Sequence, residues 1–240
     1  MKNLKLFLIA VLCVATVTAA DAQFKKRVSG NGKVQKEERK ATPFTGVKTS
    51  AGIDVFLSQG QGHSIVVEAD ENLIDYIITE IDNGTLRIYP DNISIRGTRT
   101  MRVYVTMEDV ESLHTSSAGD IIGETPVRAE KMKISTSSSG DVKLEVYASE
   151  LRLKTSSAGD ITLKGTADYV DASTSSAGDI KAYDLEVREA DLRASSAGDI
   201  KLTITERMNA RASSAGDIHY RGNPQYVDAR SSSGGDVTRK

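Results

Sequence analysis

The second half of the chain alternates between apolar and polar residues, and short runs of small residues interrupt the alternation. Around "TSSAGDI" at 115–121, apolar residues occupy every second position both before and after the small polar run. A period of two is typical of a β-strand that buries one face. A cluster of Ser, Ala, Gly and Asp between two such strands indicates a turn. The pattern therefore predicts a strand, a tight turn and a second strand.

This unit occurs seven times between residues 113 and 240, and the Asp of each copy sets its register. Successive copies are 18 to 21 residues apart, a period typical of stacked supersecondary units. The sequence has neither long stretches with the helical period nor the Leu/Asn pattern of leucine-rich repeats. We therefore expect an all-β fold, a β-solenoid with coils of about 18–21 residues stacked about 4.8 Å apart.

The columns of the repeat predict which side chains point inward. The residue after each Asp is Ile or Val, the residue seven before it is Leu, Ile or Ala, and the residue five before it is Thr, Ala or Ser. We expect these three columns to face the interior. Between the last two lies a column expected to point outward: His114, Ser135, Lys154, Ser173, Arg193, Arg211 and Arg230.

The Gly–Asp pair of each copy is predicted to form the corner of a coil. Gly adopts a positive φ without steric cost, and an Asp carboxylate accepts hydrogen bonds from nearby backbone N–H groups, as in an Asx-turn. The small Ser and Ala residues suit a tightly wound wall. The expected structural corner residues are Gly119, Asp120, Gly140, Asp141, Gly159, Asp160, Gly178, Asp179, Gly198, Asp199, Gly216, Asp217, Gly235 and Asp236.

Residues 43–112 carry less regular strand patterns and are expected to cap the N-terminal end of the 113–240 array, so that 43–240 form one domain. The stretch "VKTSAGIDVFL" at 47–57 is an irregular eighth copy, with Ile53 inserted before Asp54. Strand patterns follow in "SIVVEA", "TLRIYP" and "MRVYVT", and Asn83-Gly84 predicts a hairpin turn. "ENLIDYIITEI" fits either a short helix or a strand.

The last copy runs only four residues past Asp236 and shows no capping pattern. An open coil presents unpaired strand edges. We therefore expect a homo-oligomer that forms through this end of the solenoid.

Residues 1–22 are typical of a signal peptide, with Lys2 and Lys5, the apolar run "LFLIAVLCVATV" and an A-x-A site at 20–22. The run is too short to span a membrane comfortably, so we expect an exported chain without a membrane span, in the periplasm or at the cell surface. Residues 23–42 are highly charged and lack an apolar period, which predicts a flexible leader.

Removal of residues 1–22 changes the available chemistry. It takes away Cys13, the only cysteine, and leaves 29 Lys and Arg against 32 Asp and Glu, a net charge of −3. Neither disulfides nor thiol chemistry are then open to the chain. The small negative charge gives no electrostatic support for nucleic-acid binding.

Candidate catalytic and metal-binding patterns are sparse. Stacked Asp corners raise the question of calcium, but the G-G-x-G-x-D spacing of calcium β-rolls is missing, and hydrogen bonding to backbone accounts for the Asp. The three His are scattered and no G-x-S-x-G motif occurs. No coil stands out with its own cluster of Asp, Arg and aromatic residues. We expect no catalytic residues, no metal and no cofactor, and the candidate ligand-binding residues are Arg193, Arg211 and Arg230.

Several stretches together resemble one known family. The motif "F-x-G-V-x-x-S-A-G-I-D-V" spans 44–55, "ENLIDYI" precedes "NGTLRIY", and the iterated "SSAGDI" follows. With the export signal, they resemble the head GIN domain or putative auto-transporter adhesin family of secreted Bacteroidetes-type proteins. The resemblance covers residues 43–240 and implies an exported, β-solenoid-like envelope protein. It supplies no catalytic residues, and the adhesin label is a fold-level analogy.

The sequence thus favours an exported, non-enzymatic β-solenoid that binds a glycan, an envelope polymer or a surface protein. Two alternatives stay open. One is a periplasmic scaffold that maintains the envelope and has no external ligand, and the other is a polysaccharide lyase or hydrolase.

Overall fold

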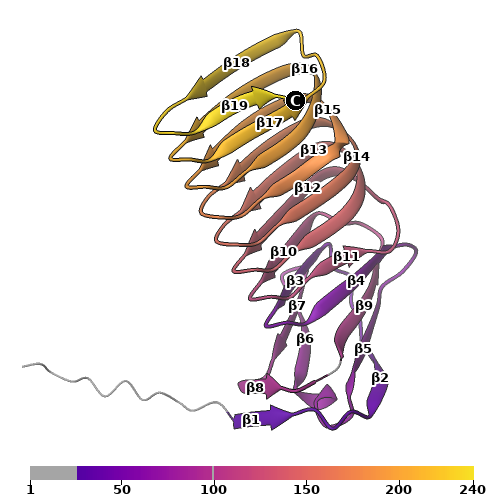
Figure 1. Cartoon of the computed structure of the whole chain (residues 1–240). Helices are drawn as coiled ribbons and strands as arrows, with labels where there is room; N and C mark the ends of the chain where they lie inside the picture. The colour runs from indigo at the N-terminus through magenta and orange to yellow at the C-terminus, as the bar shows by residue number, and fades with distance from the viewer. Residues whose placement is uncertain (1–25, 99) are drawn as a thin grey trace, which may run out of the picture.

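The computed structural model describes residues 26–98 and 100–240, and it shows a stack of flattened β coils on a β-rich base (Figure 1). The predicted signal peptide, residues 1–22, lies outside the described residues. Among the described residues, nearly all regular secondary structure is β-strand, and the exception is one short 3-10 helix, η1 (Ile74–Tyr76). The predicted all-β solenoid is confirmed.

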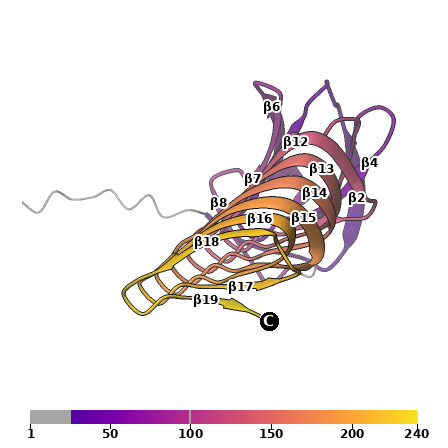
Figure 2. The same cartoon turned by 90° about the horizontal axis from the view of Figure 1, so that it is seen from above.

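Parallel strands build the repeat array, and each one pairs with the equivalent strand of the next coil. From β13 to β16 one strand runs the whole way between two corners and bends midway, so its two halves lie in opposite layers (Figure 2). Each of these coils is therefore one long bent strand. The strands are β10 (Ser112–Ser116), β11 (Ile121–Gly123), β12 (Val127–Ser137), β13 (Val142–Thr155), β14 (Ile161–Thr174), β15 (Ile180–Ser195), β16 (Ile200–Ser213), β17 (Asp217–Arg221), β18 (Tyr226–Ser231) and β19 (Asp236–Arg239).

Differences in coil length are absorbed at the bend. β15 has 16 residues against 14 in β14 and in β16. Its register with β16 shifts between Ala182 and Glu186 and again between Val187 and Glu189. Bulges of this kind let one strand carry extra residues while the pairing resumes on either side, so the corners stay aligned.

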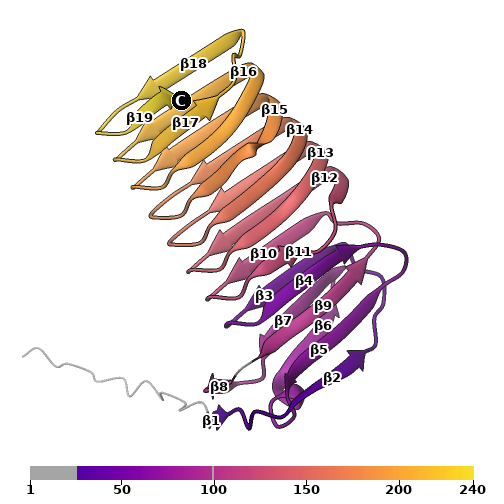
Figure 3. The same cartoon turned by 45° about the vertical axis from the view of Figure 1, so that its right-hand side comes forward.

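The base extends both layers of the array. β3 (Gly46–Ser50) pairs in parallel with β10, and β4 (Asp54–Gln59) with β11, so the irregular eighth copy is a true coil (Figure 3). One layer then continues through β7 (Thr85–Pro90) and β6 (Ile77–Asp82), and the other through β9 (Met101–Met107) and β5 (Ser64–Asp70). The ambiguous "ENLIDYIITEI" contributes η1 and then β6.

Two segments of the expected flexible leader, residues 23–42, are paired strands instead. β2 (Val34–Arg39) pairs along its whole length with β5 in antiparallel register, and β1 (Lys26–Ser29) pairs with β8 (Ile93–Arg96). β2 buries no apolar face, because its one apolar residue, Val34, is 44% exposed and its other side chains are polar and largely exposed. An edge strand of this kind has no apolar period to read, and charged side chains are typical of sheet edges.

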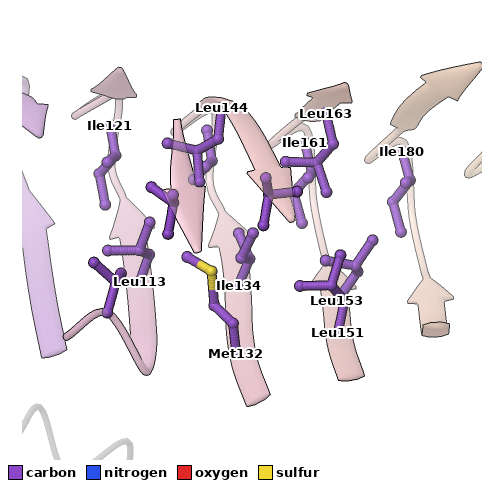
Figure 4. Packing of buried hydrophobic residues seen from close by; sticks show 14 of the residues in the cluster. Leu113, Ile121, Met132, Ile134, Leu144, Leu151, Leu153, Ile161, Leu163 and Ile180 are labelled. Atoms are coloured by element: carbon purple, nitrogen blue, oxygen red, sulfur yellow. The ribbon is translucent and has the colours of Figure 1, made fainter. Parts of the chain in front are cut away.

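The interior is thin and is filled by stacked aliphatic side chains. Leu113, Ile134 and Leu153 lie in one column, and Ile121, Ile161 and Ile180 lie in the column across from it (Figure 4). Each of these residues is at most 2% exposed. The three inward columns predicted from the repeat, the Thr column included, are therefore buried in every copy but the last. The buried Thr residues are Thr49, Thr115, Thr136, Thr155 and Thr174.

Candidate functional site

The turn of each corner is made by the small residues before Gly. Ser117 and Ala118 have φ of 54° and 64°, and the N–H of Gly119 donates to the Ser116 carbonyl over 3.4 Å. The corner Gly residues themselves do not have positive φ, so the expected reason for their presence is wrong. A left-handed backbone costs a residue with a Cβ about 1–2 kcal/mol, and the Ser and Ala residues bear that strain here.

Close approach between coils explains the corner Gly instead. A Cβ on Gly178 would lie 2.9 Å from the Gly159 carbonyl oxygen and 2.8 Å from Oγ1 of Thr155. The carbonyl oxygen of the preceding corner Gly lies at a similar distance in most of the other coils. Gly is therefore required because the coil beneath leaves no room for a side chain.

The corner Asp residues link one coil to the next. The Asp141 N–H donates to Oδ1 of Asp120 over 3.0 Å, and the Asp160 N–H donates to Oδ1 of Asp141 over 3.0 Å. The sequence predicted bonds within one turn, but the carboxylate accepts from the following coil. The carboxylate thus takes the place of a backbone carbonyl as the acceptor, and the hydrogen bonds between coils continue around the corner. The same bond joins Asp54 to Asp120, Asp160 to Asp179, Asp179 to Asp199 and Asp217 to Asp236.

Stacking of carboxylates changes their ionisation. Burial raises the pKa of Asp120, the N–H of Asp141 lowers it, and the negative charge of Asp141 raises it, so the net shift is upward. Burial likewise raises the pKa of Asp54. Lys181 contacts both Asp160 and Asp179, the latter at 3.6 Å, and offsets the repulsion in that part of the ladder.

The structure brings the predicted ligand-binding residues together. Arg193, Arg211 and Arg230 are direct partners in β15, β16 and β18, so they form a continuous outward column. The eighth coil adds Lys48 to the other end of the column. We call this set the cationic column: Lys48, His114, Ser135, Lys154, Ser173, Arg193, Arg211 and Arg230.

No acidic residue belongs to the cationic column, and its charges are exposed. The Arg193 side chain is 59% exposed and contacts Asp171 at 3.0 Å, and Arg230 contacts Asp228 at 3.3 Å. Within the described part of the chain, Lys48, Lys154 and Arg211 form no ion pair. Exposed pairs of this kind contribute little, about 0–1 kcal/mol, so the Arg side chains stay available to a ligand. Burial, and next Lys48, lower the pKa of His114, which therefore adds little charge at neutral pH.

A column of serines runs beside the cationic column, one residue past each Thr of the inward column or its replacement, and these serines are half-buried in every copy but the last. Ser195 and Ser213 are direct partners, as are Ser116 and Ser137. Hydroxyl groups next to a line of cations can donate and accept hydrogen bonds. The serine column consists of Ser50, Ser116, Ser137, Ser156, Ser175, Ser195, Ser213 and Ser232.

The outward column two residues before the cationic column carries Asp171, Asp191 and Asp228 in the later coils, and it is not among the columns predicted from the repeat. Asp191 accepts from the Tyr169 hydroxyl over 2.6 Å and from Nδ2 of Asn209 over 2.7 Å. Burial and then the bond to Asp191 raise the pKa of Tyr169 to about 12. Burial alone would raise the pKa of Asp191, but the hydrogen bonds and two nearby Arg residues lower it. Alignment of the repeats two positions upstream of the Arg column would have found these residues.

Two shallow hollows lie on this face. One, of about 230 Å³, is lined by Asp191, Leu192, Arg193, Asn209, Arg211 and Asp228. The larger, of about 650 Å³, lies where the base meets the array and is lined mainly by charged residues. Its Glu150 pairs with Lys131 at 3.3 Å and with Arg152 at 2.9 Å. The charged lining of both hollows fits a polar ligand better than an apolar one.

Most of the outward aromatic rings are covered by cations. Arg128 lies over Tyr147 with 4.7 Å between the guanidinium carbon and the ring centroid, and Arg102 lies over Phe56 at 5.6 Å. Such cation–π contacts stabilise the surface and leave little free ring face for stacking on a sugar. The other covered rings are those of Tyr76, Tyr89, Tyr104, Tyr183 and Tyr226.

The described residues offer no assembled metal centre. Across 26–98 and 100–240, His, Cys, Asp and Glu side chains nowhere gather in a group of three or more that could hold an ion. The same ranges contain no helix with the length and apolar character needed to cross a bilayer.

Fold and surface together define a β-solenoid with one flat, charged and hydroxyl-rich face. Residues 43–224 match the family described as "Putative auto-transporter adhesin, head GIN domain", and the chain belongs to this family. The resemblance seen in the sequence is therefore confirmed. No curated protein matches the chain.

Solved structures share the fold. A "putative adhesin" from Bacteroides fragilis is similar at a TM-score of 0.83 and 19% identity, covering 89% of this chain and 100% of its own. A "putative adhesin" from Parabacteroides merdae gives 0.73 and 20%, covering 90% and 99%. A "Putative lipid binding protein" from Parabacteroides distasonis gives 0.69 and 28%, covering 89% and 100%.

Proposed function

We propose that this protein is an exported, non-enzymatic, adhesin-like binding protein whose cationic column holds a linear acidic polymer along the solenoid axis. Membership of the adhesin-like family supports the general role. The cationic column supports the particular ligand class, because it is continuous over successive coils and contains no acid. An acidic glycan or envelope polymer is the ligand we propose.

The spacing of the coils supports an extended ligand. Equivalent side chains of paired parallel strands recur about every 4.8 Å along the stack. A polymer with a repeating negative charge would meet a cation, a hydroxyl or the imidazole of His114 at each step, so many weak contacts would add up. A compact ligand would use only one or two coils. The covered aromatic rings also favour recognition through charge over recognition through stacking.

Replacement of three cations tests the proposal. Arg193→Ala, Arg211→Ala and Arg230→Ala together should weaken binding to an acidic polysaccharide at least about tenfold, since each exposed ionic contact is worth about 0.5–1 kcal/mol. Binding should also fall as salt is raised, because exposed charges are screened. A panel of acidic and neutral polysaccharides, measured by calorimetry or surface binding, gives the readout.

The opposite layer offers a matched control. Lys143, Lys181 and Lys201 lie in one outward column of the other sheet, so their triple replacement by Ala removes the same charge. Equal loss of binding in both triple variants would show that net charge, and not the cationic column, attracts the polymer. Binding to neutral polysaccharides that survives high salt would contradict the proposed ligand class.

Location decides between the adhesin-like role and the scaffold alternative. We propose export by the predicted signal peptide and exposure at the cell surface. Protease treatment of intact cells should then remove the protein and spare a periplasmic control. Survival of the protein until the outer membrane is opened would instead favour the periplasmic scaffold.

Self-association is the last part of the proposal. We infer that copies of the protein associate through the open end of the last coil. The strand edges of β18 and β19 support this, because their side chains are mostly exposed.

A further inference from the structure

The last described coil leaves the interior of the solenoid uncovered. Val227 belongs to the inward column that contains Ala190 and Met208, which are 2% and 0% exposed. Val227 itself is 43% exposed. Its neighbour in the same strand, Ala229, is also exposed, although its partner Ala210 is buried. The end of the core is therefore an apolar surface of the kind that another coil would normally cover.

Backbone groups are open at the same place. β18 pairs with β16, and β19 pairs with β17, so each has one paired edge among the described residues. The corner ladder also stops here. Six of the earlier Asp residues accept from the following coil, but Asp236 accepts instead from the N–H of Val237, over 2.8 Å, and from the hydroxyl of Thr238.

The charges of β18 are self-complementary under a two-fold rotation. Its sequence is Tyr-Val-Asp-Ala-Arg-Ser. If two copies pair antiparallel about Ala229, Asp228 of each copy lies opposite Arg230 of the other. The same register places Ala229 opposite Ala229 and Val227 opposite Ser231, all on the inward side. Opposite charges directly across a strand pair stabilise it by about 0.2–1 kcal/mol each.

The second strand fits the same axis. Thr238 lies as many residues after the centre of the turn at Ser233 and Gly234 as Ala229 lies before it. A two-fold axis through both positions pairs β19 with its counterpart about Thr238. Asp236 then lies opposite Lys240 of the other copy. Both layers therefore offer opposite charges in one and the same arrangement.

We propose that two copies of the protein associate head to head through their last coils, with β18 antiparallel to β18 and β19 antiparallel to β19. The arrangement rests on the self-association proposed above and specifies its partner, its symmetry and its register. An isologous contact of this kind closes after two copies, so it covers both exposed cores and leaves no free edge at the junction. The two cationic columns would then run in opposite directions along one longer molecule.

Charge reversal tests the register. Asp228→Arg should place Arg opposite Arg, and Arg230→Asp should place Asp opposite Asp, so each single variant should weaken the dimer at least about tenfold. The double variant, Asp228→Arg with Arg230→Asp, should restore it. Sedimentation equilibrium of residues 23–240 measures the association. As the control, Arg188→Asp reverses an exposed charge in mid-array that pairs with Glu206, and it should leave the dimer unchanged.

A cysteine variant gives a readout that does not depend on the charges. The mature chain has no cysteine, so Ala229→Cys introduces a single thiol at the proposed axis. Directly opposed residues of an antiparallel pair lie about 4.5–5.5 Å apart between Cα atoms, within the range of a disulfide. Mild oxidation should therefore give a covalent dimer. Thr166→Cys, on an outward position of mid-array, should give none.

The outcomes separate the two proposals. A wild-type monomer at high concentration would overturn both self-association and the head-to-head arrangement, and would point to another protein as the cover of the last coil. A wild-type dimer that ignores both charge reversals and fails to crosslink at Ala229→Cys would overturn only the head-to-head arrangement. If a charge variant loses its folded circular dichroism signal, the cysteine variant still decides.

Discussion

Each corner has two structural requirements, a left-handed backbone in the turn and close contact between coils, and different small residues meet them. Ser and Ala take the left-handed backbone, as at Ser196 and Ala197 with φ of 55° and 65°. Gly stands where two coils come closest, as at Gly178. In the irregular eighth copy and in the last copy of the array, the second turn residue is itself Gly, at Gly52 and Gly234. The array therefore tolerates Gly in the turn but requires it at the contact.

Opposite substitutions at these two positions should have opposite effects. Ala197→Gly relieves a left-handed residue whose side chain is exposed, so it should raise the free energy of unfolding by about 0.5–1 kcal/mol. Gly178→Ala drives a Cβ against the Gly159 carbonyl and should lower it by about 1–3 kcal/mol. Urea denaturation measures both. Equal stability of the two variants would contradict this division of the two requirements.

The carboxylate of Asp120 does two things that substitution can separate: it accepts the Asp141 N–H and it carries a charge beside other charges. Asp120→Ala removes the acceptor of that N–H, and because the bond is exposed to solvent the loss should cost about 0.5–1.5 kcal/mol. Asp120→Asn keeps an acceptor oxygen and removes the charge, so at neutral pH it should be at least as stable as the wild type.

The pH dependence follows from the raised pKa of Asp120. Its folded pKa lies above the unfolded value, so the ionised group costs stability at neutral pH, and this cost is relieved as pH falls through the folded pKa. The advantage of Asn over Asp should therefore shrink between about pH 7 and pH 4. Urea denaturation at several pH values is the measurement, and an advantage that grows on acidification would contradict the assignment.

At the scale of elements, the repeat tolerates bulges because the pairing resumes at every corner. β15 carries two more residues than its neighbours, yet its Ile180 and Ala194 keep their partners in β16. The alternation of apolar and polar residues made the strands of the array predictable. The alternation did not reveal β2, because β2 is held by hydrogen bonds to the edge of β5 and packs no apolar face against the core.

Deletion of one complete coil should leave the rest of the fold intact. Removal of residues 161–179 joins Asp160 to Ile180 and so recreates the motif "SSAGDI" at the junction. Each coil contacts mainly its neighbours, so the variant should fold, with lower stability and a smaller urea m-value in proportion to the area lost. Removal of residues 161–169 should instead abolish folding, because half a coil cannot restore the register. A folded half-coil variant would contradict this account.

At the scale of the whole molecule, the stack converts a repeated sequence into continuous columns. Arg193, Arg211 and Arg230 are 18 and 19 residues apart in the sequence and adjacent in the sheet. The same stacking adds Lys48 from the base. Because successive coils are alike, function has to arise from chemical differences between the columns of side chains and from the two ends of the stack. The cationic column and the uncovered last coil are the features of this kind that the two proposals use.

The sequence by itself determined the solenoid, its coil length, the inward columns and the family, because a fixed period and a strict alternation leave few ways to bury the apolar residues. Tertiary structure alone decided three further features: why the corners need Gly, where the Asp carboxylates bind, and which charged side chains pair across coils, as Arg193 does with Asp171. These depend on distances between coils, and a contact across coils leaves no trace in the order of residues within one coil. The physical reason is that stacking, and not local conformation, brings those groups together.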